Sequence, residues 1–438
     1  MAMDPVVVVG GGLAGLTAAR RLHDLGYPVR VFEAEPEIGG RVRTRRHPDG
    51  FLIDRGFQIL LSAYPALRRN VDLEAIGARP FDSGALVWTG KRRVPLRNPW
   101  RHPRGIVRDI TSPVFGVADK VRLARWGVET SRAPWTTIAE AAVATNDRSI
   151  LGELRAMGFS EAFIDRFARP FWGGITLDRS LSVSAGVARF TTKMFLEGDA
   201  VLPRDGVAAL PRAIAAGLPA GTIETSTPVE ALVIEGYRAT GVRVGGTTVP
   251  AAAVVVATDP PTAARLTGFP TIPTDGVGCV TVYLASGTDP GIGTLLTIDG
   301  TGRQAVNHIA PLSAVQPAYA PEGQHLLAAV LLGEEAVSRD DDDNARVALE
   351  SAREMLQLEA LRVIEVVPVP FALYRQVPGI HRRLPDATTG VEGLVLASDA
   401  TVDASVNGAI TSGEDAAHAV RMTIGDNLGS ESSSWSLD

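Results

Sequence analysis

The sequence predicts an α/β protein whose Rossmann-like, doubly wound domain is discontinuous along the chain and carries an inserted α+β domain. Three observations predict this class. A run of β-branched residues near the N-terminus precedes a glycine-rich turn and a helical pattern, which is the order of a βαβ nucleotide-binding unit. Similar buried strands recur in the middle and near the end of the chain. The stretches between them have other patterns, so a second domain is expected to interrupt the first.

The composition limits what the chain can be. Its 438 residues, 45% of them apolar, suffice for two or three domains with substantial cores. A single cysteine excludes a disulfide framework and a cysteine-based metal site, and the seven histidines show no metal-ligand spacing, so no metal is predicted. The net charge of −6 argues against a nucleic-acid partner. No apolar run reaches the roughly 18 residues of a membrane span, and a strand pattern begins at Val6. We therefore expect no targeting peptide and a cytoplasmic location.

The first strand and helix form a compact unit. The continuous run Val6–Val9 is typical of a strand buried on both faces of a parallel sheet. Residues 13–25 have apolar side chains at helical spacing and end before Gly26, a typical helix stop. Residues 29–32 form a second strand pattern. Together they predict one βαβ unit of about thirty residues.

The turn inside this unit matches the dinucleotide pattern G-x-G-x-x-G. In that pattern Gly10 allows the tight turn, Gly12 lets the backbone approach a pyrophosphate, and Gly15 lets the helix pack closely on the sheet. The phosphates would lie at the positive end of the helix. Glu33 ends the second strand, where a carboxylate accepts hydrogen bonds from ribose hydroxyls and repels a 2′-phosphate. NADP is therefore disfavoured, while NAD and FAD remain open at this point.

Further residues carry a family resemblance. The sequence Gly-Gly-Arg at 39–41 follows Glu33 by six residues, and Asp-Arg-Gly-Phe-Gln follows at 54–58. With the glycine motif, these resemble the N-terminal signature of the flavin amine oxidoreductase superfamily, which includes amine oxidases, protoporphyrinogen oxidases and phytoene-desaturase-like enzymes. Residues 393–400 resemble the strand of that family that ends in A-G-D, with Ser398 in place of the glycine.

The resemblance implies a bound FAD in a glutathione-reductase-like domain. It implies that Arg41 contacts phosphate and that residues 56–58 lie near the isoalloxazine ring. It further implies that Asp399 bonds a ribityl hydroxyl or positions the pyrophosphate, and that the last helix directs its N-terminal amides at the N1–C2 edge of the flavin. The implied cofactor-binding residues are Gly10, Gly12, Leu13, Ala14, Gly15, Glu33, Ala34, Gly39, Gly40, Arg41, Gly56, Phe57, Gln58, Val229, Asp399, Val406, Asn407, Gly408 and Ala409.

The order of the motifs predicts how the domains divide the chain. We expect the FAD-binding domain at 1–62, 200–265 and 386–424. The substrate domain, with a helical part, is expected at 63–199 and 266–385, and its strands include residues 277–284 and 325–332. A serine-rich tail at 425–438 is expected to be disordered.

Two observations qualify the resemblance. Many amine oxidases place a lysine near flavin N5, but residues 287–332 contain none, which weakens a specific amine-oxidase assignment. Cys279, the only cysteine, lies on a predicted strand, where a core cysteine fits better than a covalent flavin link. We therefore expect the FAD to be bound noncovalently.

Five residues are candidates for the substrate site. Tyr374 is a candidate for the pocket wall, and Arg375 or Gln376 for orienting a polar group. The alternative for all three is a strand–loop joint with polar residues facing solvent. Trp172 lines the substrate pocket or packs in the core, and His308 is a polar pocket residue or a structural histidine.

The leading hypothesis is an FAD-dependent oxidoreductase that moves a hydride from a C–N or C–C bond of a largely apolar small molecule to flavin N5. Oxygen or another acceptor would reoxidise the flavin. The alternatives are a redox-neutral isomerase or mutase and a non-catalytic flavin-binding protein. Residues 91–132 contain eleven Lys and Arg against three Asp and Glu. This segment is a solvated insertion, the mouth of an anionic-substrate site or a patch that contacts a membrane surface.

Overall fold

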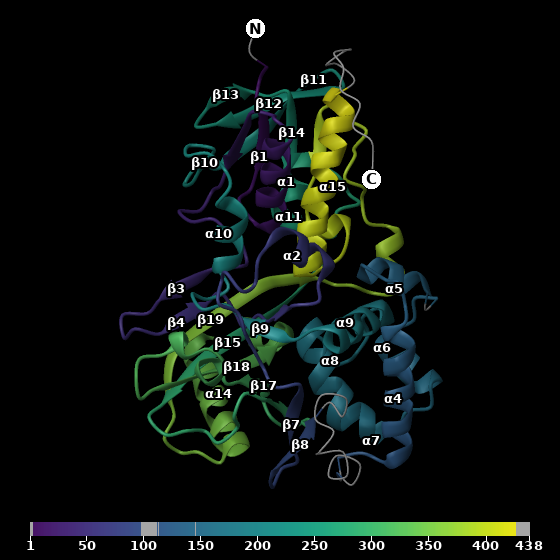
Figure 1. Cartoon of the computed structure of the whole chain (residues 1–438), viewed down its shortest axis with the longest axis vertical. Helices are drawn as coiled ribbons and strands as arrows, with labels where there is room; N and C mark the ends of the chain where they lie inside the picture. The colour runs from purple at the N-terminus through teal and green to yellow at the C-terminus, as the bar shows by residue number, and fades with distance from the viewer. Residues whose placement is uncertain (1–2, 98–111, 113, 145, 426–438) are drawn as a thin grey trace.

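The computed structural model describes residues 3–97, 112, 114–144 and 146–425. Figure 1 shows three parts: a small parallel sheet with its helices, a larger mixed sheet, and a group of helices beside that sheet. Residues 426–438 of the tail that is expected to be disordered, and residues 98–111 and 113 of the basic segment, lie outside the described residues.

The small sheet confirms the doubly wound prediction. Its strands follow the order β10-β2-β1-β14-β20, and each neighbouring pair is parallel. Val7 lies opposite Val254, which lies opposite Leu394, so segments from the start, middle and end of the chain meet in one sheet. The strands are β1 (Val6–Val9), β2 (Val29–Phe32), β10 (Ile223–Glu224), β14 (Ala253–Val256) and β20 (Leu394–Leu396).

Both faces of this sheet are covered, which explains its continuous apolar strands. Helices α1 (Leu13–Asp24) and α15 (Val406–Gly425) lie side by side on one face (Figure 1). They approach closely because Gly413 has no side chain: a Cβ there would lie only 2.4 Å from the carbonyl oxygen of Ala14. The other face packs against α11 (Pro260–Thr267) and an antiparallel sheet of β11 (Val229–Glu235), β12 (Arg238–Val244) and β13 (Thr247–Pro250).

The larger sheet has seven strands in the order β19-β15-β18-β17-β16-β7-β8. All neighbours are antiparallel except β16 and β7. Helix α14 (Asp341–Leu356) covers one face through an apolar cluster. The strands are β7 (Gly84–Trp88), β8 (Arg93–Arg97), β15 (Gly276–Ser286), β16 (Leu296–Asp299), β17 (Val306–Ala310), β18 (His325–Leu332) and β19 (Arg362–Tyr374). The pairing of β15 with β18 confirms that the two predicted strands share a second sheet.

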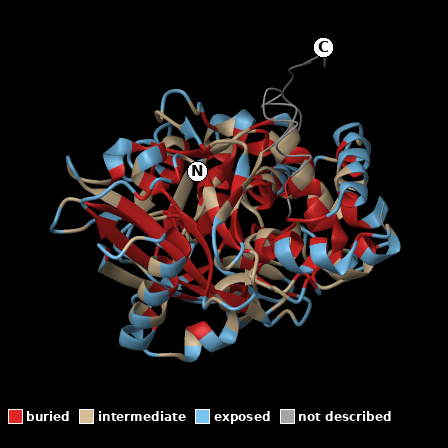
Figure 2. Ribbon diagram, turned by 90° about the horizontal axis from the view of Figure 1, so that it is seen from below, coloured by how far each residue is buried: buried red, intermediate tan, exposed pale blue. Residues whose placement is uncertain are grey.

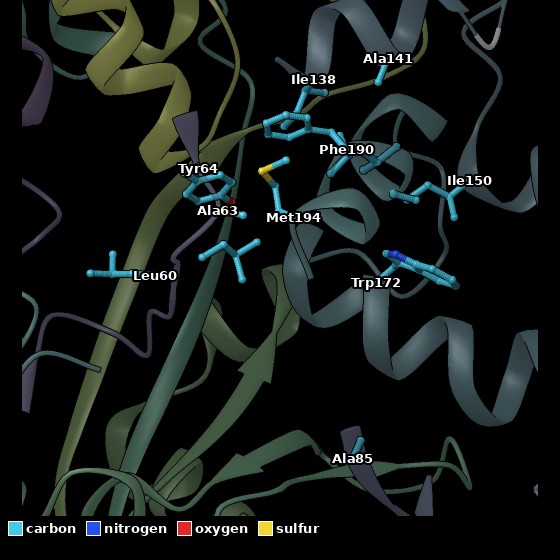
Figure 3. Packing of buried hydrophobic residues seen from close by; sticks show 14 of the residues in the cluster. Leu60, Ala63, Tyr64, Ala85, Ile138, Ala141, Ile150, Trp172, Phe190 and Met194 are labelled. Atoms are coloured by element: carbon cyan, nitrogen blue, oxygen red, sulfur yellow. The ribbon is translucent and has the colours of Figure 1, made fainter. Parts of the chain in front are cut away.

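The helical part pairs apolar faces around aromatic side chains. Trp126 and Trp172 lie in its centre with their ring centroids 5.1 Å apart. Figure 3 shows Trp172 beside Ile150 and, on the other side of this part, Phe190 and Met194 toward Tyr64. Figure 2 shows that the outward faces of the helices are exposed and their inward faces are buried. Its elements are α4 (Val117–Ser131), α5 (Ile138–Ala144), α6 (Ile150–Ala156), α7 (Glu161–Phe163), the π-helical turn η2 (Ile164–Ala168), α8 (Arg169–Thr176) and α9 (Ala185–Glu197).

Short elements join these parts. Strands β3 (Thr44–Arg46) and β4 (Leu52–Asp54) form a hairpin, and β9 (Ala200–Leu202) pairs with β5 (Leu60–Leu61) and β6 (Arg79–Pro80). The remaining helices are α2 (Pro65–Asn70), α10 (Ala209–Ala215), α12 (Leu312–Val315) and α13 (Gly333–Ser338). The exact domain boundaries stay a prediction.

Candidate active site

A cavity of about 1360 Å³ lies where the parallel sheet, the larger sheet and the helical part meet. Most of the predicted cofactor residues line it, and they come from loops at the carboxyl ends of the parallel strands, where ligands bind in this class of fold. They are Gly10, Gly12, Leu13, Ala14, Glu33, Ala34, Gly39, Gly40, Arg41, Gly56, Phe57, Gln58, Val229, Asp399, Val406 and Ala409. Gly15, Asn407 and Gly408 are not among the lining residues.

The three motif glycines have different surroundings. A Cβ on Gly10 would lie 2.7 Å from the Ala257 carbonyl oxygen, and a Cβ on Gly15 would lie 2.0 Å from that of Gly10. These two glycines therefore permit the turn and the helix packing. A Cβ on Gly12 would meet nothing within 4 Å, so its space opens into the cavity at the start of α1. This open cradle at a helix N-terminus fits the pyrophosphate of a dinucleotide.

The Glu33 carboxylate holds the glycine turn as well as facing the cavity. Its Oε2 accepts a hydrogen bond from the Gly11 amide at 2.7 Å, and its Oε1 accepts one from the Glu35 amide at 2.9 Å. The side chain is buried and lines the cavity beside Val229. It is therefore fixed where ribose hydroxyls are expected to reach it.

Arg41 and Asp399 meet directly. Their side chains form an ion pair at 2.9 Å, and Arg41 also donates a hydrogen bond to the Ala372 carbonyl on β19. Burial acts to lower the pKa of Arg41, but the neighbouring Asp399 carboxylate raises it overall, so the guanidinium stays charged. Ser398, which stands where the family has glycine, donates a hydrogen bond to Asp399 Oδ1 at 3.1 Å. Its φ of −148° is extended, so serine introduces no backbone strain.

Residues 56–58 connect the two sheets beside the cavity. The Phe57 amide donates to Thr281 Oγ1 at 3.0 Å, and Gln58 Nε2 donates to the Arg41 carbonyl at 2.8 Å. The Phe57 ring lies 5.4 Å from the His308 ring. The predicted flavin-contacting segment is thus next to a predicted substrate residue.

The start of α15 also faces the cavity, through Ser405, Val406 and Ala409. Asn407 instead holds the helix in place: its Oδ1 accepts from the Ala66 amide and its Nδ2 donates to the Thr136 carbonyl, both at 3.0 Å. Gly408 is required for packing, because a Cβ there would lie 2.2 Å from the Asp403 carbonyl oxygen. These two residues position the helix end rather than line the cavity.

The part of the cavity away from the glycine turn is lined mainly by apolar side chains from the helices. Phe167, Phe171 and Trp172 come from η2 and α8, and Phe195 and Leu196 come from α9. Phe167, Phe195 and Leu196 were not predicted from the sequence. Helical spacing marks such residues as buried, but it does not reveal that they face a cavity.

His308 lies on β17 with a defined environment. Asn307 Nδ2 lies 3.0 Å from His308 Nδ1; an amide nitrogen is a donor, so Nδ1 accepts and the proton is on Nε2. Burial, and secondarily the charge of Arg179, lowers the pKa of His308 to about 4. A neutral imidazole therefore lines the cavity beside Phe57 and Gly174.

The three predicted catalytic residues lie in different surroundings. Tyr374 is buried in a small cluster and does not line the cavity. Arg375 points away and pairs with Asp275 at 3.2 Å on the exposed surface. Only Gln376 lines the cavity, and its Oε1 accepts from the Ala404 amide at 3.2 Å.

A buried polar network lies at the junction of the two sheets. Asp54 accepts hydrogen bonds from the hydroxyls of Thr44, at 2.5 Å, and Tyr319, at 2.7 Å, and from the Val207 amide at 3.1 Å. Tyr283 donates to the Asp54 carbonyl. Burial raises the pKa of Asp54 to about 6 although these hydrogen bonds oppose the shift.

Comparison with known proteins decides the family. The model of the flavin-containing amine oxidoreductases matches residues 13–421. The chain belongs to the flavin-containing amine oxidoreductase family. This agrees with the resemblance that the glycine, Gly-Gly-Arg and C-terminal motifs predicted.

Individual curated relatives match only part of this chain, and the chain spans less than a third of the length of the two relatives that follow. It is 36% identical over 130 residues to a carotenoid phi-ring synthase of Streptomyces griseus, covering 27% of this chain and 25% of the synthase. It is 28% identical over 176 residues to a coproporphyrinogen III oxidase of Propionibacterium freudenreichii, covering 39% and 31%. A crystal structure of an oxidoreductase from Methanosarcina mazei superposes with a TM-score of 0.72 at 19% identity, covering 93% of this chain and 99% of that one. This last likeness supports the fold.

Among the helices of residues 3–97, 114–144 and 146–425, none combines the length and the apolar character needed to cross a membrane.

Proposed function

We propose that this protein binds FAD noncovalently and oxidises a C–N or C–C bond of a largely apolar small molecule, with oxygen or another acceptor reoxidising the flavin. When bound, the flavin supplies the acceptor for the hydride of the substrate. A cytoplasmic location belongs to the same proposal.

One observation carries the proposal: a single cavity joins the dinucleotide cradle at Gly12 to a mainly apolar chamber in the helical part. The chamber is lined by aromatic rings such as Phe171 and Phe195, and Asp82, which also lines it, is turned toward Arg97 at 3.9 Å. Such a lining favours uncharged, apolar substrates.

The chain's own residues orient the substrate and exclude water. His308 keeps Nε2–H as a neutral donor in a cavity that is mainly apolar, where a hydrogen bond to a polar substrate atom is strong. The start of α15 lines the cavity through Ser405 and Val406, and a helix N-terminus at this place would stabilise negative charge on the flavin. Phe57 and Trp172 fill the walls between these groups.

Noncovalent binding is supported by the state of Cys279. This thiol lines the cavity, but burial raises its pKa to about 12. It is therefore protonated at neutral pH, and a protonated thiol is a poor nucleophile for a flavin link.

The redox-neutral and non-catalytic alternatives have no specific support. Both require the same cradle. The redox-neutral reaction also requires a substrate chamber joined to it, so the cavity by itself does not separate that reaction from net oxidation. Similarity to an enzyme named as an oxidase favours net oxidation.

The test is anaerobic stopped-flow bleaching of the flavin absorbance across a panel of amines, isoprenoids and other apolar metabolites. We expect at least one compound to bleach the flavin, and oxygen or an added acceptor to restore its absorbance. Chemical reduction with dithionite shows that the bound flavin is competent. Purified protein that lacks flavin absorbance and does not take up added FAD would contradict the proposal, and turnover without acceptor consumption would favour the redox-neutral alternative.

A further inference from the structure

A second cavity, of about 570 Å³, lies apart from the flavin cavity at the free end of the larger sheet. Three segments of the chain build it: the turn from β7 to β8, the π-helical turn η2, and the turn after β16. Its lining residues are Val87, Thr89, Arg92, Val94, Asp165, Arg166, Gly300, Thr301 and Arg303. No residue of the two cavities is shared.

Three arginines at this cavity carry charge that no carboxylate neutralises within the described parts of the chain. Arg92 and Arg303 form no ion pair there, and Arg166 donates only to the Val114 carbonyl at 3.3 Å. The one acid in the lining, Asp165, is engaged by Arg169 at 2.9 Å. This contrasts with a net charge of −6 for the whole chain, so the local positive charge is not a general property of the surface.

The turn that carries Arg303 is fixed by a buried carboxylate. Asp299 accepts hydrogen bonds from the amide of Thr301 at 2.9 Å and from its hydroxyl at 2.6 Å, and the Gln304 amide donates to it at 3.2 Å. Arg179 pairs with the same side chain at 3.4 Å. Arg303 therefore extends from a preorganised turn, which reduces the entropy lost when it binds a ligand.

Two glycines bring the three segments together. A Cβ on Gly300 would lie 2.5 Å from a Val87 methyl carbon and 3.0 Å from the Arg166 carbonyl oxygen. A Cβ on Gly90 would lie 2.9 Å from Nη2 of Arg303. The guanidinium of Arg303 thus rests against the β7–β8 turn, next to the segment that carries Arg92.

We propose that this cavity is an anion site for a phosphorylated small molecule or headgroup with two or more negative oxygens. Guanidinium groups bind phosphate oxygens in pairs of parallel hydrogen bonds. The charge of three arginines is larger than the single charge of a carboxylate ligand, which favours a ligand with two or more negative charges. The Thr89 and Thr301 hydroxyls add further polar groups at the rim. One wall contains the π-helical turn η2, and such turns are frequent at functional sites.

The test is calorimetric titration of the full chain with inorganic pyrophosphate in saturating FAD, so that the dinucleotide cradle is filled. We expect one binding event per chain that weakens as salt is added. Arg92→Gln and Arg303→Gln should each raise the Kd at least about tenfold, the loss expected for a charge-assisted contact. Both side chains are exposed, so the fold should be retained, and an unchanged melting temperature verifies this.

Arg243→Gln is the matched control, because it removes an exposed arginine from β12 at the opposite end of the molecule (Figure 1). Its pyrophosphate affinity should equal that of the wild type. Vesicles of phosphatidylcholine with phosphatidic acid distinguish the source of the phosphate. If the wild type binds these vesicles and the double variant, with both Arg92→Gln and Arg303→Gln, does not, the ligand is a lipid headgroup. If the wild type binds pyrophosphate but not the vesicles, the ligand is a free phosphate compound. Failure to bind either probe, or equal affinity in the double variant and the wild type, would overturn the site.

Discussion

The two ends of the flavin cavity are built by different means. At the dinucleotide end, backbone groups and short motifs do most of the work: Gly12 leaves space, and Glu33 holds the Gly11 amide. At the substrate end, side chains from η2, α8, α9 and β17 form the walls, among them Phe167 and His308. A backbone cradle requires particular residues at fixed spacing, whereas a side-chain wall requires only shape and polarity. The first end is therefore shared across a family, while the second is free to vary with the substrate.

The strongest test of this contrast is Gly12→Ala. Gly12 has an extended conformation, with φ −78° and ψ −178°, and a Cβ there meets no protein atom. The methyl group should leave the fold intact but occupy the space into which a pyrophosphate must come. We expect the Kd for FAD to rise by at least about a hundredfold, measured by the fluorescence change of added FAD.

Gly15→Ala is the matched variant, in which we expect a loss of stability in place of a direct block of FAD binding. Its Cβ would lie 2.0 Å from the Gly10 carbonyl oxygen, so the folded protein should lose about 3 kcal/mol of stability from overpacking. Urea unfolding of both apoproteins separates the two roles. Equal destabilisation in the two variants, or unchanged FAD affinity in Gly12→Ala, would show that the cradle is assigned wrongly.

A smaller effect is expected at the Arg41–Asp399 pair, where the two ends of the cavity are linked. Asp399→Asn removes the charge that faces Arg41 at 2.9 Å. It should weaken FAD binding by about tenfold and lower stability by about 1 kcal/mol, because the Arg41 guanidinium loses its counterion but is still partly exposed to solvent. FAD titration and thermal unfolding measure the two effects. Asp275→Asn, which disrupts the exposed pair with Arg375, is the control and should change neither quantity appreciably.

The same contrast explains how much the sequence could predict. The strands around 6–9, 254–256 and 394–396 and the cavity role of Glu33 follow from local patterns, and the structure places them accordingly. Phe167 and Phe195 could not be found, because helical spacing shows that a side chain is buried but not whether it meets a neighbour or a cavity. The second role of Asn407, whose side chain ties α15 to α2 and to residue 136, could not be predicted either, because it depends on segments more than 200 residues away along the chain.

Asp54, at the junction of the two sheets, is expected to titrate at mildly acidic pH. The pKa of Asp54 is raised to about 6 by burial, above the ~3.9 of an unfolded aspartate. Between about pH 4 and 6 the folded protein therefore keeps a proton that the unfolded chain releases. The free energy of unfolding should fall as the pH rises through this window, with roughly 2 kcal/mol due to Asp54.

Asp54→Asn removes this contribution. Other groups titrate in the same range, including Asp403, whose pKa burial also raises to about 6, so the difference between variant and wild type is the informative quantity. Urea unfolding from pH 4 to 7 should show the variant gaining about 2 kcal/mol relative to the wild type as the pH rises. A pH-independent difference would mean that Asp54 is ionised throughout.

The smallest effect is expected at Arg375, which the sequence placed beside Gln376 as a catalytic candidate. Consecutive residues of an extended strand point in opposite directions. Tyr374, at the end of β19, points inward, so Arg375 points outward to Asp275, with 39% and 76% of the two side chains exposed. Exposed pairs of this kind contribute little. Arg375→Ala should change stability by less than about 0.5 kcal/mol and leave FAD affinity and the rate of flavin bleaching unaltered.

Gln376→Ala should alter the bleaching rate, because Gln376 lines the cavity and accepts from the Ala404 amide. A large rate loss in Arg375→Ala alone would mean that β19 ends in a different register when substrate binds.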